Sequence, residues 1–330
     1  MNTPRVSVLM AVYNGGSWLD ESIRSIAAQT FRDWELIVVD DASTDGTREV
    51  IEAWSRRDPR VRLVANPTNK GQTACLNQGL SVCRGPWIAR QDADDISAPR
   101  RLAEQMDYLE AHPDTMLLGT QGVLIDDAGR RVGLLDVPAD GAGVLWWSAF
   151  LNPFLHTSVV FRRENVMGEF GGYDTNFRIA QDYDLWTRVA ARYPTANVAE
   201  RLISYRRTGT SLSRAGADAA YAETDTVSAR EARRVFGRPW SAEEEALSGQ
   251  FRRGLSAVQR SSFHRMIKRL AAEFRARYPH AAAAPENAQP AWHLRLAGSA
   301  GSVSAAAGEM WRAMWHDPAF TLRWCKDRWL

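Results

Sequence analysis

The chain has 330 residues, 45% of them hydrophobic, which is enough apolar material for one large domain or two smaller ones. The net charge of +2 is unevenly distributed, because residues 201–330 carry 21 Lys and Arg against 12 Asp and Glu, whereas residues 1–200 carry 20 against 27. Three cysteines without a CxxC spacing argue against a disulfide framework or a zinc site, and no apolar run approaches the roughly 18 residues of a spanning helix.

Strand and helix patterns alternate four times in the first hundred residues. Four short, apolar, β-branched runs predict buried strands at Val6–Val12, Glu35–Val39, Val61–Val64 and Trp87–Arg90. Helices are expected between them, the first with a capping box from Ser17 to Asp20. This alternation predicts a parallel sheet covered by helices on both faces, and ligands bind such sheets at the carboxyl ends of the strands.

Beyond residue 99 the pattern is less regular. After one more helix, the sequence predicts a strand, a hairpin turn, a second strand and a helix, at Met116–Gly119, Asp126–Gly129, Ser158–Phe161 and Gln181–Arg192. From about residue 215 the chain is rich in Ala, Arg and Glu and is expected to be helical, with an Ala/Pro linker at Pro279–Pro290.

The strongest local signal is the acidic run Asp92-Ala-Asp94-Asp95, which follows a predicted strand. Three carboxylates this close repel one another unless a cation or ordered donors neutralise them. Hard divalent cations prefer carboxylate oxygens and often hold substrate phosphates as well. The run therefore indicates a metal site for a phosphate-bearing ligand, and a solvated acidic loop is the alternative.

Asp40 and Asp41 end the second predicted strand. A carboxylate at this position can accept hydrogen bonds from a base or a ribose, as acidic residues do in dinucleotide-binding sheets. The alternative is a helix N-cap with Ser43 nearby. Neither GxGxxG nor GxxxxGK[ST] occurs, so neither a dinucleotide site nor a P-loop is indicated.

Five short motifs follow one another in a fixed order, namely Pro4–Asn14, Val39–Gly46, Asn69–Leu80, Ile88–Asp95 and Pro99–Leu102. Together they resemble the signature of family 2 inverting glycosyltransferases over about residues 4–213. The resemblance implies a GT-A fold, an α/β architecture in which a Rossmann-like nucleotide-binding half joins an acceptor half around a mixed central sheet. It suggests a catalytic domain at 1–214, with donor binding at about 1–120 and the acceptor part at about 121–214, and a helical region at 215–330.

The resemblance also implies roles for single residues on the donor side. Asp41 would bind the base, most often uracil, with Ala11 and Tyr13 lining the same pocket and Lys70 touching the donor. A solvated loop lysine is the alternative for Lys70.

The acidic run has its own implied role. Asp92 and Asp94 would form a DxD pair at the nucleotide, with Asp94 as the principal ligand of Mn²⁺ or Mg²⁺ on the diphosphate and Asp95 assisting. The ion would neutralise the charge that grows on the departing nucleoside diphosphate.

A downstream segment, Gly171–Asp174 with Gln181–Trp186, resembles the region that holds the family's catalytic base. Gln181-Asp182 stands where the usual pair is Glu-Asp, so Asp182 would take the proton from the acceptor hydroxyl in a single displacement. The alternative is that Asp182 or Asp184 only favours the dipole of a helix.

Three further positions have weaker signals. Thr208 stands where the family often has a histidine, which leaves the role of that histidine unassigned. Arg206 or Arg207 would contact phosphate or form a surface salt bridge. His156, in the segment Asn152–His156, is expected to be structural.

The C-terminal segment mixes tryptophan with arginine, as in Trp311–His316 and Phe320–Leu330. Such a composition suits an interfacial helix, so peripheral contact with the inner face of the cytoplasmic membrane is expected, and tryptophans packed on the domain are the alternative. The compartment expected for the protein is the cytoplasm. Nucleic acid is not an expected partner, because the donor half lacks a basic patch and no nucleic-acid motif occurs.

The sequence therefore predicts a metal-dependent, inverting glycosyltransferase. It would move a sugar from a nucleotide sugar, expected to be UDP-linked, to a hydroxyl of a glycan or lipid-linked glycan in surface polysaccharide biosynthesis. A sugar-phosphate nucleotidyltransferase is one alternative, although Tyr13–Ser17 lacks the basic residue expected of its glycine-rich loop. A degenerate, non-catalytic glycan-binding protein is another alternative. Asp41, Asp92, Asp94 and Asp182 together argue against it, whereas the departures from the family pattern at Gln181 and Thr208 keep it open.

Overall fold

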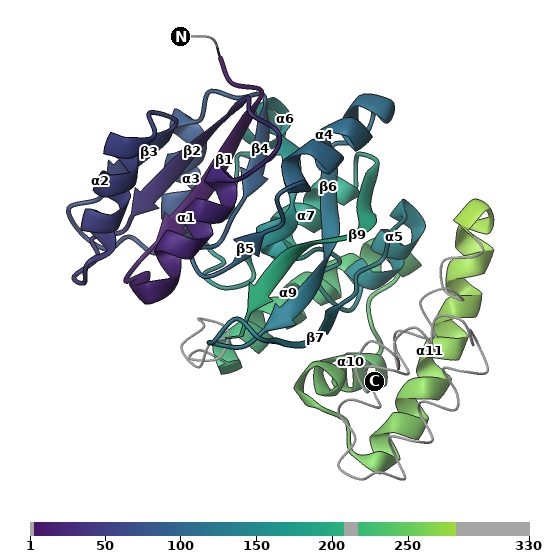
Figure 1. The fold of residues 1–330 in the computed structure, drawn as a ribbon. Helices are drawn as coiled ribbons and strands as arrows, with labels where there is room; N and C mark the ends of the chain where they lie inside the picture. The colour runs from purple at the N-terminus through teal and green to yellow at the C-terminus, as the bar shows by residue number, and fades with distance from the viewer. Residues whose placement is uncertain (1–2, 208–216, 282–330) are drawn as a thin grey trace. The chain divides into compact units, whose positions relative to one another are not determined.

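The computed structural model describes residues 3–207 and 217–281 (Figure 1). The chain divides into two compact units, Met1–Ala139 with Phe154–Ala215 and Asp140–Pro153 with Gly216–Leu330, and each has its own hydrophobic core. Thr208, the Trp/Arg-rich end of the chain and most of the expected linker at Pro279–Pro290 lie outside the described residues.

The first unit is built on one nine-stranded mixed sheet with the order β3-β2-β1-β4-β8-β6-β9-β5, and β7 pairs with β6. The first four strands are parallel and each lies within one residue of its predicted limits: β1 (Val6–Val12), β2 (Trp34–Asp40), β3 (Val61–Ala65) and β4 (Trp87–Arg90). The other strands are β5 (Ile96–Ser97), β6 (Leu117–Ile125), β7 (Arg131–Leu135), β8 (Val160–Arg162) and β9 (Thr195–Arg206).

Helices cover both faces of the parallel half, as predicted. Alternate residues of a strand face opposite sides. Val8 and Met10 of β1 belong to the core that also contains apolar residues of α1 (Leu19–Ala27), α2 (Thr47–Arg57) and α4 (Arg101–Ala111). Leu9 lies on the other side, against α3 (Gln72–Val82). The remaining helices of this unit are η1 (Gly16–Trp18), η2 (His156–Ser158), α6 (Arg163–Phe170) and α7 (Gln181–Ala190).

The predicted capping box at Ser17 is wrong. A 3-10 turn, η1, precedes α1, and the N-cap residue Trp18 makes no side-chain capping hydrogen bond. Backbone N–H groups at the start of this turn bond instead to the segment that follows β2, because Gly15 N donates to Thr47 Oγ1 at 2.8 Å and Gly16 N donates to Asp45 Oδ2 at 3.2 Å. A long-range contact thus replaces the local cap that the sequence indicated.

Close packing of α3 on the sheet depends on Gly79. A Cβ atom at this position would lie 2.2 Å from Leu9 Cδ1 and 3.1 Å from Val39 Cγ2. We expect Gly79→Ala to lower the free energy of unfolding by about 1–2 kcal/mol, because overpacking outweighs the gain of roughly 1 kcal/mol in helix propensity. Thermal unfolding checks this, with the exposed Ser81→Ala as the control on the same helix. A Gly79→Ala protein as stable as the wild type would contradict the close contact.

The second unit contains α5 (Gly141–Ser148), α9 (Ala217–Phe236), α10 (Ala242–Arg253), α11 (Ala257–Arg277) and the short η3 (Pro279–Ala281). Its core is aromatic, with Trp146 and Phe150 packed against Phe236 and Trp240. This packing explains why 140–153 groups with the C-terminal helices, whereas the division we expected was a simple cut near residue 214. In the described ranges, 3–207 and 217–281, no helix is long and apolar enough to cross a membrane.

Candidate active site

The predicted nucleotide-binding residues and the acidic run lie at or just beyond the carboxyl ends of the parallel strands. Val12 of β1 pairs with Asp40 of β2, and Leu9 of β1 pairs with Arg90 of β4. The loops that follow these strands therefore emerge at the same edge. They carry the predicted nucleotide-binding residues and the acidic run.

Asp41 is almost fully buried and fastens the loop that leads into α3. Its Oδ1 accepts hydrogen bonds from Asn66 Nδ2 at 3.0 Å and Lys70 N at 2.9 Å, and its Oδ2 accepts one from Gly71 N at 2.8 Å. Burial raises the pKa of this carboxyl, but these hydrogen bonds and one from Cys75 outweigh it, so the pKa lies below its ordinary value. The carboxylate is therefore held in its charged form.

The alternative role of Asp41 as a helix N-cap is wrong, because α2 begins at Thr47 and its N-cap is Gly46. The backbone around Asp41 is unusual instead. Ala42 has φ of 62° and Asn14, on the adjacent loop after β1, has φ of 52°. Non-glycine residues with a positive φ are strained and are often found at functional sites. Asn14 N donates to Ser43 Oγ at 2.9 Å, which ties the two loops together.

The other predicted nucleotide-binding residues differ in exposure. Ala11 lies near the end of β1 with 9% exposure, and Tyr13, just beyond it, is 52% exposed. This exposure leaves the Tyr13 ring available to a planar ligand. Lys70 contributes its backbone N–H to Asp41, while its side chain is exposed.

The acidic run forms a tight turn whose three carboxylates differ. Asp92 and Asp94 are partly exposed, whereas Asp95 is buried and accepts a hydrogen bond from Arg206 N at 2.7 Å. Burial, with the charge of Asp92, raises the pKa of Asp94 to about 6. Asp95 therefore supports the turn. The carboxyl that was expected to assist at the metal thus lies inside the protein.

Asp92 and Asp94 suit a hard divalent cation. They offer carboxylate oxygens whose mutual repulsion a cation would relieve. No group of three or more His, Cys, Asp or Glu side chains in the described part of the chain is arranged to hold a metal ion. Mg²⁺ commonly takes one or two carboxylates and completes its shell with water and substrate phosphates. The two carboxylates thus fit an ion that a diphosphate also binds.

Arg206 at the end of β9 is a structural residue, neither exposed at the surface nor open to phosphate. It is 2% exposed, and its guanidinium donates to Asp94 O at 2.9 Å, to Asp126 O at 3.0 Å and to Glu21 Oε2 at 2.6 Å. These bonds hold the acidic turn against α1 and the turn between β6 and β7.

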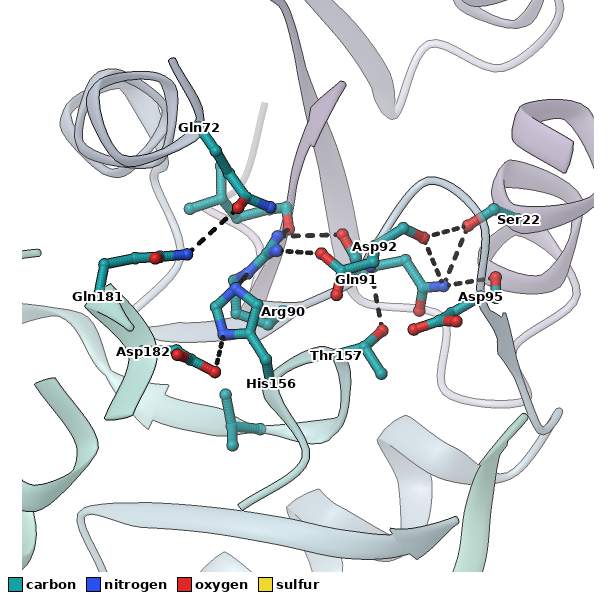
Figure 2. A network of polar contacts seen from close by, with 12 residues as sticks. Ser22, Gln72, Arg90, Gln91, Asp92, Asp95, His156, Thr157, Gln181 and Asp182 are labelled. Atoms are coloured by element: carbon teal, nitrogen blue, oxygen red, sulfur yellow. Dashed lines mark hydrogen bonds and ion pairs between the residues drawn. The ribbon is translucent and has the colours of Figure 1, made fainter. Parts of the chain in front are cut away.

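Asp182 lies in the first turn of α7 and reaches the same region (Figure 2). Its side chain is 16% exposed, and burial raises its pKa to about 7, with a further contribution from the charge of Asp92. A carboxylate with such a pKa suits general base work near neutral pH. Asp184, by contrast, is buried in an ion pair with Arg188 at 2.8 Å.

The start of α7 is held in place by α3. Gln181 Nε2 donates to Gln72 Oε1 at 3.2 Å (Figure 2). Just before α7, Phe177 O accepts a hydrogen bond from Thr73 Oγ1 at 2.8 Å. Gln72 follows directly on the loop that Asp41 fastens. Long-range contacts therefore connect the predicted base to the predicted nucleotide site.

Two buried arginines in this region, Arg90 and Arg101, make more polar contacts than the sequence suggested. Arg90 is fully buried at the end of β4 and contacts both Asp92 and His156. A second buried arginine, Arg101, donates to Arg90 O at 2.7 Å and to Gln91 Oε1 at 3.1 Å. The sequence signal for Arg90 is a charged residue at the end of a predicted buried strand.

Comparison with known proteins identifies the family and the fold. The family described as Glycosyl transferase family 2 matches residues 7–168. The chain is 39% identical over 188 residues to putative glycosyltransferase EpsE of Bacillus subtilis (strain 168), a match that covers 56% of this chain and 66%, just under two thirds, of EpsE. It is 31% identical over 204 residues to the amylovoran biosynthesis glycosyltransferase AmsE of Erwinia amylovora, covering 61% of this chain and 75% of AmsE.

Solved structures share the fold. The S. aureus TarS 1–349 structure in complex with UDP-GlcNAc has a TM-score of 0.56 at 16% identity, covering 95% of this chain and 92% of that one. Mannosyltransferase PcManGT of Pyrobaculum calidifontis, in complex with GDP-Man and Mn²⁺, has a TM-score of 0.52 at 22% identity, covering 99% and 84%. The expected GT-A fold is thereby confirmed. The chain belongs to glycosyl transferase family 2 and is a glycosyltransferase.

Proposed function

We propose that the protein transfers a sugar from a UDP-linked donor to a hydroxyl of a glycan or lipid-linked glycan, with inversion. The observation that carries the proposal is the partly exposed Asp182, linked through His156 and Arg90 to the DxD carboxylate Asp92. This arrangement sets a base of suitable pKa beside a candidate diphosphate site.

Each residue has a distinct task in this proposal. Asp41, with Ala11, Tyr13 and Lys70, binds the nucleotide at the strand ends. Asp94 and Asp92 hold Mn²⁺ or Mg²⁺, which when bound neutralises the charge on the leaving diphosphate. Asp182 accepts the proton of the acceptor hydroxyl as its oxygen attacks the anomeric carbon, so a single displacement inverts the configuration.

The donor and acceptor classes are supported by similarity. The TarS structure contains UDP-GlcNAc and the PcManGT structure contains GDP-Man with Mn²⁺, so both support a nucleotide-sugar donor. AmsE is named for amylovoran biosynthesis, which supports a polysaccharide as the product. We propose UDP as the nucleotide because the TarS structure contains UDP-GlcNAc, and Asp41 would accept a hydrogen bond from the base N–H.

Asp41→Asn tests the nucleotide site. The amide cannot accept all the hydrogen bonds that the carboxylate accepts, so we expect UDP binding to weaken by about 1.5–3 kcal/mol, the scale of hydrogen bonds to charged groups. Calorimetric titration measures the loss. Asp58→Asn is the control, because Asp58 also has a lowered pKa, through Arg60, but precedes β3 at the opposite end of the parallel strands. Unchanged UDP affinity in Asp41→Asn would assign base recognition to other residues.

A donor panel tests the proposed activity. Incubation with UDP-, GDP- and dTDP-sugars in the presence of Mn²⁺ is expected to release a nucleoside diphosphate, fastest from a UDP-sugar. Release of pyrophosphate would favour a sugar-phosphate nucleotidyltransferase. UDP binding without turnover of any donor or acceptor would favour a non-catalytic glycan-binding protein.

We also propose a cytoplasmic location, since Cys75 and Cys83 are buried free thiols and such thiols persist in reducing compartments. Contact of the C-terminal region with a membrane remains a prediction, because residues 282–330 lie outside the described part of the chain.

A further inference from the structure

Arg90, which is fully buried, and His156, whose side chain is 12% exposed, form a polar pair between the acidic turn and Asp182 (Figure 2). The guanidinium of Arg90 donates to two backbone carbonyl oxygens, at 2.5 Å and 3.0 Å, and contacts the carboxylate of Asp92. Its Nε donates to Nε2 of His156 at 3.0 Å. One cation therefore touches both a proposed metal ligand and the imidazole beside the proposed base.

The contact with Arg90 fixes the protonation of His156. A guanidinium N–H can only donate, so Nε2 must be the unprotonated, accepting nitrogen of the ring. Burial, together with the charge of Arg90, lowers the pKa of His156 to about 3, so the ring is neutral. A neutral imidazole carries one N–H, which is therefore at Nδ1.

The Nδ1–H group faces the proposed base (Figure 2). Nδ1 is buried, makes no hydrogen bond to a described residue, and lies 3.8 Å from Oδ2 of Asp182. This is longer than a hydrogen bond, but catalytic hydrogen bonds are often long in the free enzyme and tighten in the reacting complex. An acceptor sugar cannot reach a buried nitrogen, so His156 must act through Asp182.

We propose that His156, held in its Nδ1–H form by Arg90, is the positioning residue for Asp182 and orients the carboxylate toward the acceptor hydroxyl. The proposal rests on the assignment of Asp182 as the base. No bond forms or breaks at His156, and the acceptor's proton moves to Asp182 alone. Because Arg90 also contacts Asp92, the same pair fixes the base relative to the acidic turn.

Two amide substitutions separate the two nitrogens of the ring. His156→Asn places an N–H near the position of Nδ1 and removes the acceptor for Arg90. His156→Gln places an amide oxygen near the position of Nε2 and removes the donor to Asp182. We expect kcat to fall by about 10²-fold in His156→Gln, the scale of a misplaced catalytic group, and by less than about fivefold in His156→Asn. The KM for the donor should stay unchanged in both variants.

The controls separate this proposal from the proposed function. Asp182→Asn is measured alongside, together with UDP affinity and melting temperature. If Asp182→Asn retains transfer, the base assignment itself fails. If Asp182→Asn is silent while both His156 variants keep wild-type kcat, or if both lose kcat equally, the positioning role is overturned.

A spectroscopic measurement does not depend on the variants being active. Nitrogen NMR shifts of the imidazole ring in the wild-type protein, at about pH 7, report which nitrogen is protonated. We expect a neutral ring with the proton on Nδ1. A charged ring, or a proton on Nε2, would overturn the proposal.

Discussion

Asp182→Asn is expected to lower the transfer rate by about 10²–10⁴-fold, the contribution of a positioned general base to proton transfer. The substitution keeps the size of the side chain and an oxygen that can accept the hydrogen bond from Tyr183 N, which Asp182 Oδ1 accepts at 2.8 Å. Fold, metal binding and UDP affinity should therefore survive. Product formation under saturating donor is the measurement, with calorimetric UDP titration alongside.

Asp184→Asn is the matched control, because both aspartates lie in the first turn of α7. Asp184 is buried in its ion pair with Arg188, so its loss should cost about 3–5 kcal/mol of stability, the scale for breaking a buried pair. The folded fraction should transfer sugar at close to the wild-type rate. A silent Asp184→Asn beside an active Asp182→Asn would mean that the wrong carboxylate is assigned.

The pH dependence of transfer provides an independent check on Asp182. Its pKa is raised to about 7, so the carboxyl is largely protonated below this pH and ionised above it. Only the ionised form can accept a proton, so kcat should rise from about pH 6 to about pH 8. This rising limb should disappear in Asp182→Asn.

Asp94→Ala is expected to abolish metal-stimulated turnover, with a loss of at least about 10²-fold, the scale for removing electrostatic stabilisation of a leaving group. Asp94 is partly exposed and its pKa is raised to about 6, so removing its carboxyl relieves repulsion and should leave the fold intact. Turnover with and without EDTA, at several Mn²⁺ concentrations, measures the effect.

Asp107→Ala is the control for the loss of one exposed acidic residue, since Asp107 lies on the surface of α4. It should match the wild type in turnover and in response to Mn²⁺. Full activity of Asp94→Ala, or of the wild type in EDTA, would remove the cation from the proposed mechanism.

Local patterns in the sequence predicted the parallel half of the sheet well. β1, β2, β3 and β4 are short apolar runs ended by polar loops, so their limits and their shared carboxyl edge could be read directly. The positions of the acidic run and of Asp41 could be inferred from that edge, because each directly follows a predicted strand. Their positions needed no knowledge of distant contacts.

Other features depend on contacts that no local pattern reports. The twelve-residue strand β9 was not predicted, because its pairing with β6 shifts register beside Thr120–Gly122 and its middle residues are exposed. Arg206 was expected to be a surface or phosphate-binding arginine, yet it bonds to Asp126 and Glu21, which lie 80 and 185 residues away in the chain. His156 was expected to be structural, and its place beside Asp182 arises only when α7 docks on α3.

A crystal structure of the complex with UDP and Mn²⁺ tests the proposed mechanism most directly. We expect uracil against Asp41 and Tyr13, the ion bound by Asp94 and the diphosphate, and Asp182 facing the space beside the β-phosphate where the sugar would lie. A nucleotide bound away from this edge, or an ion without Asp94 in its shell and Asp182 turned away from it, would contradict the proposed mechanism.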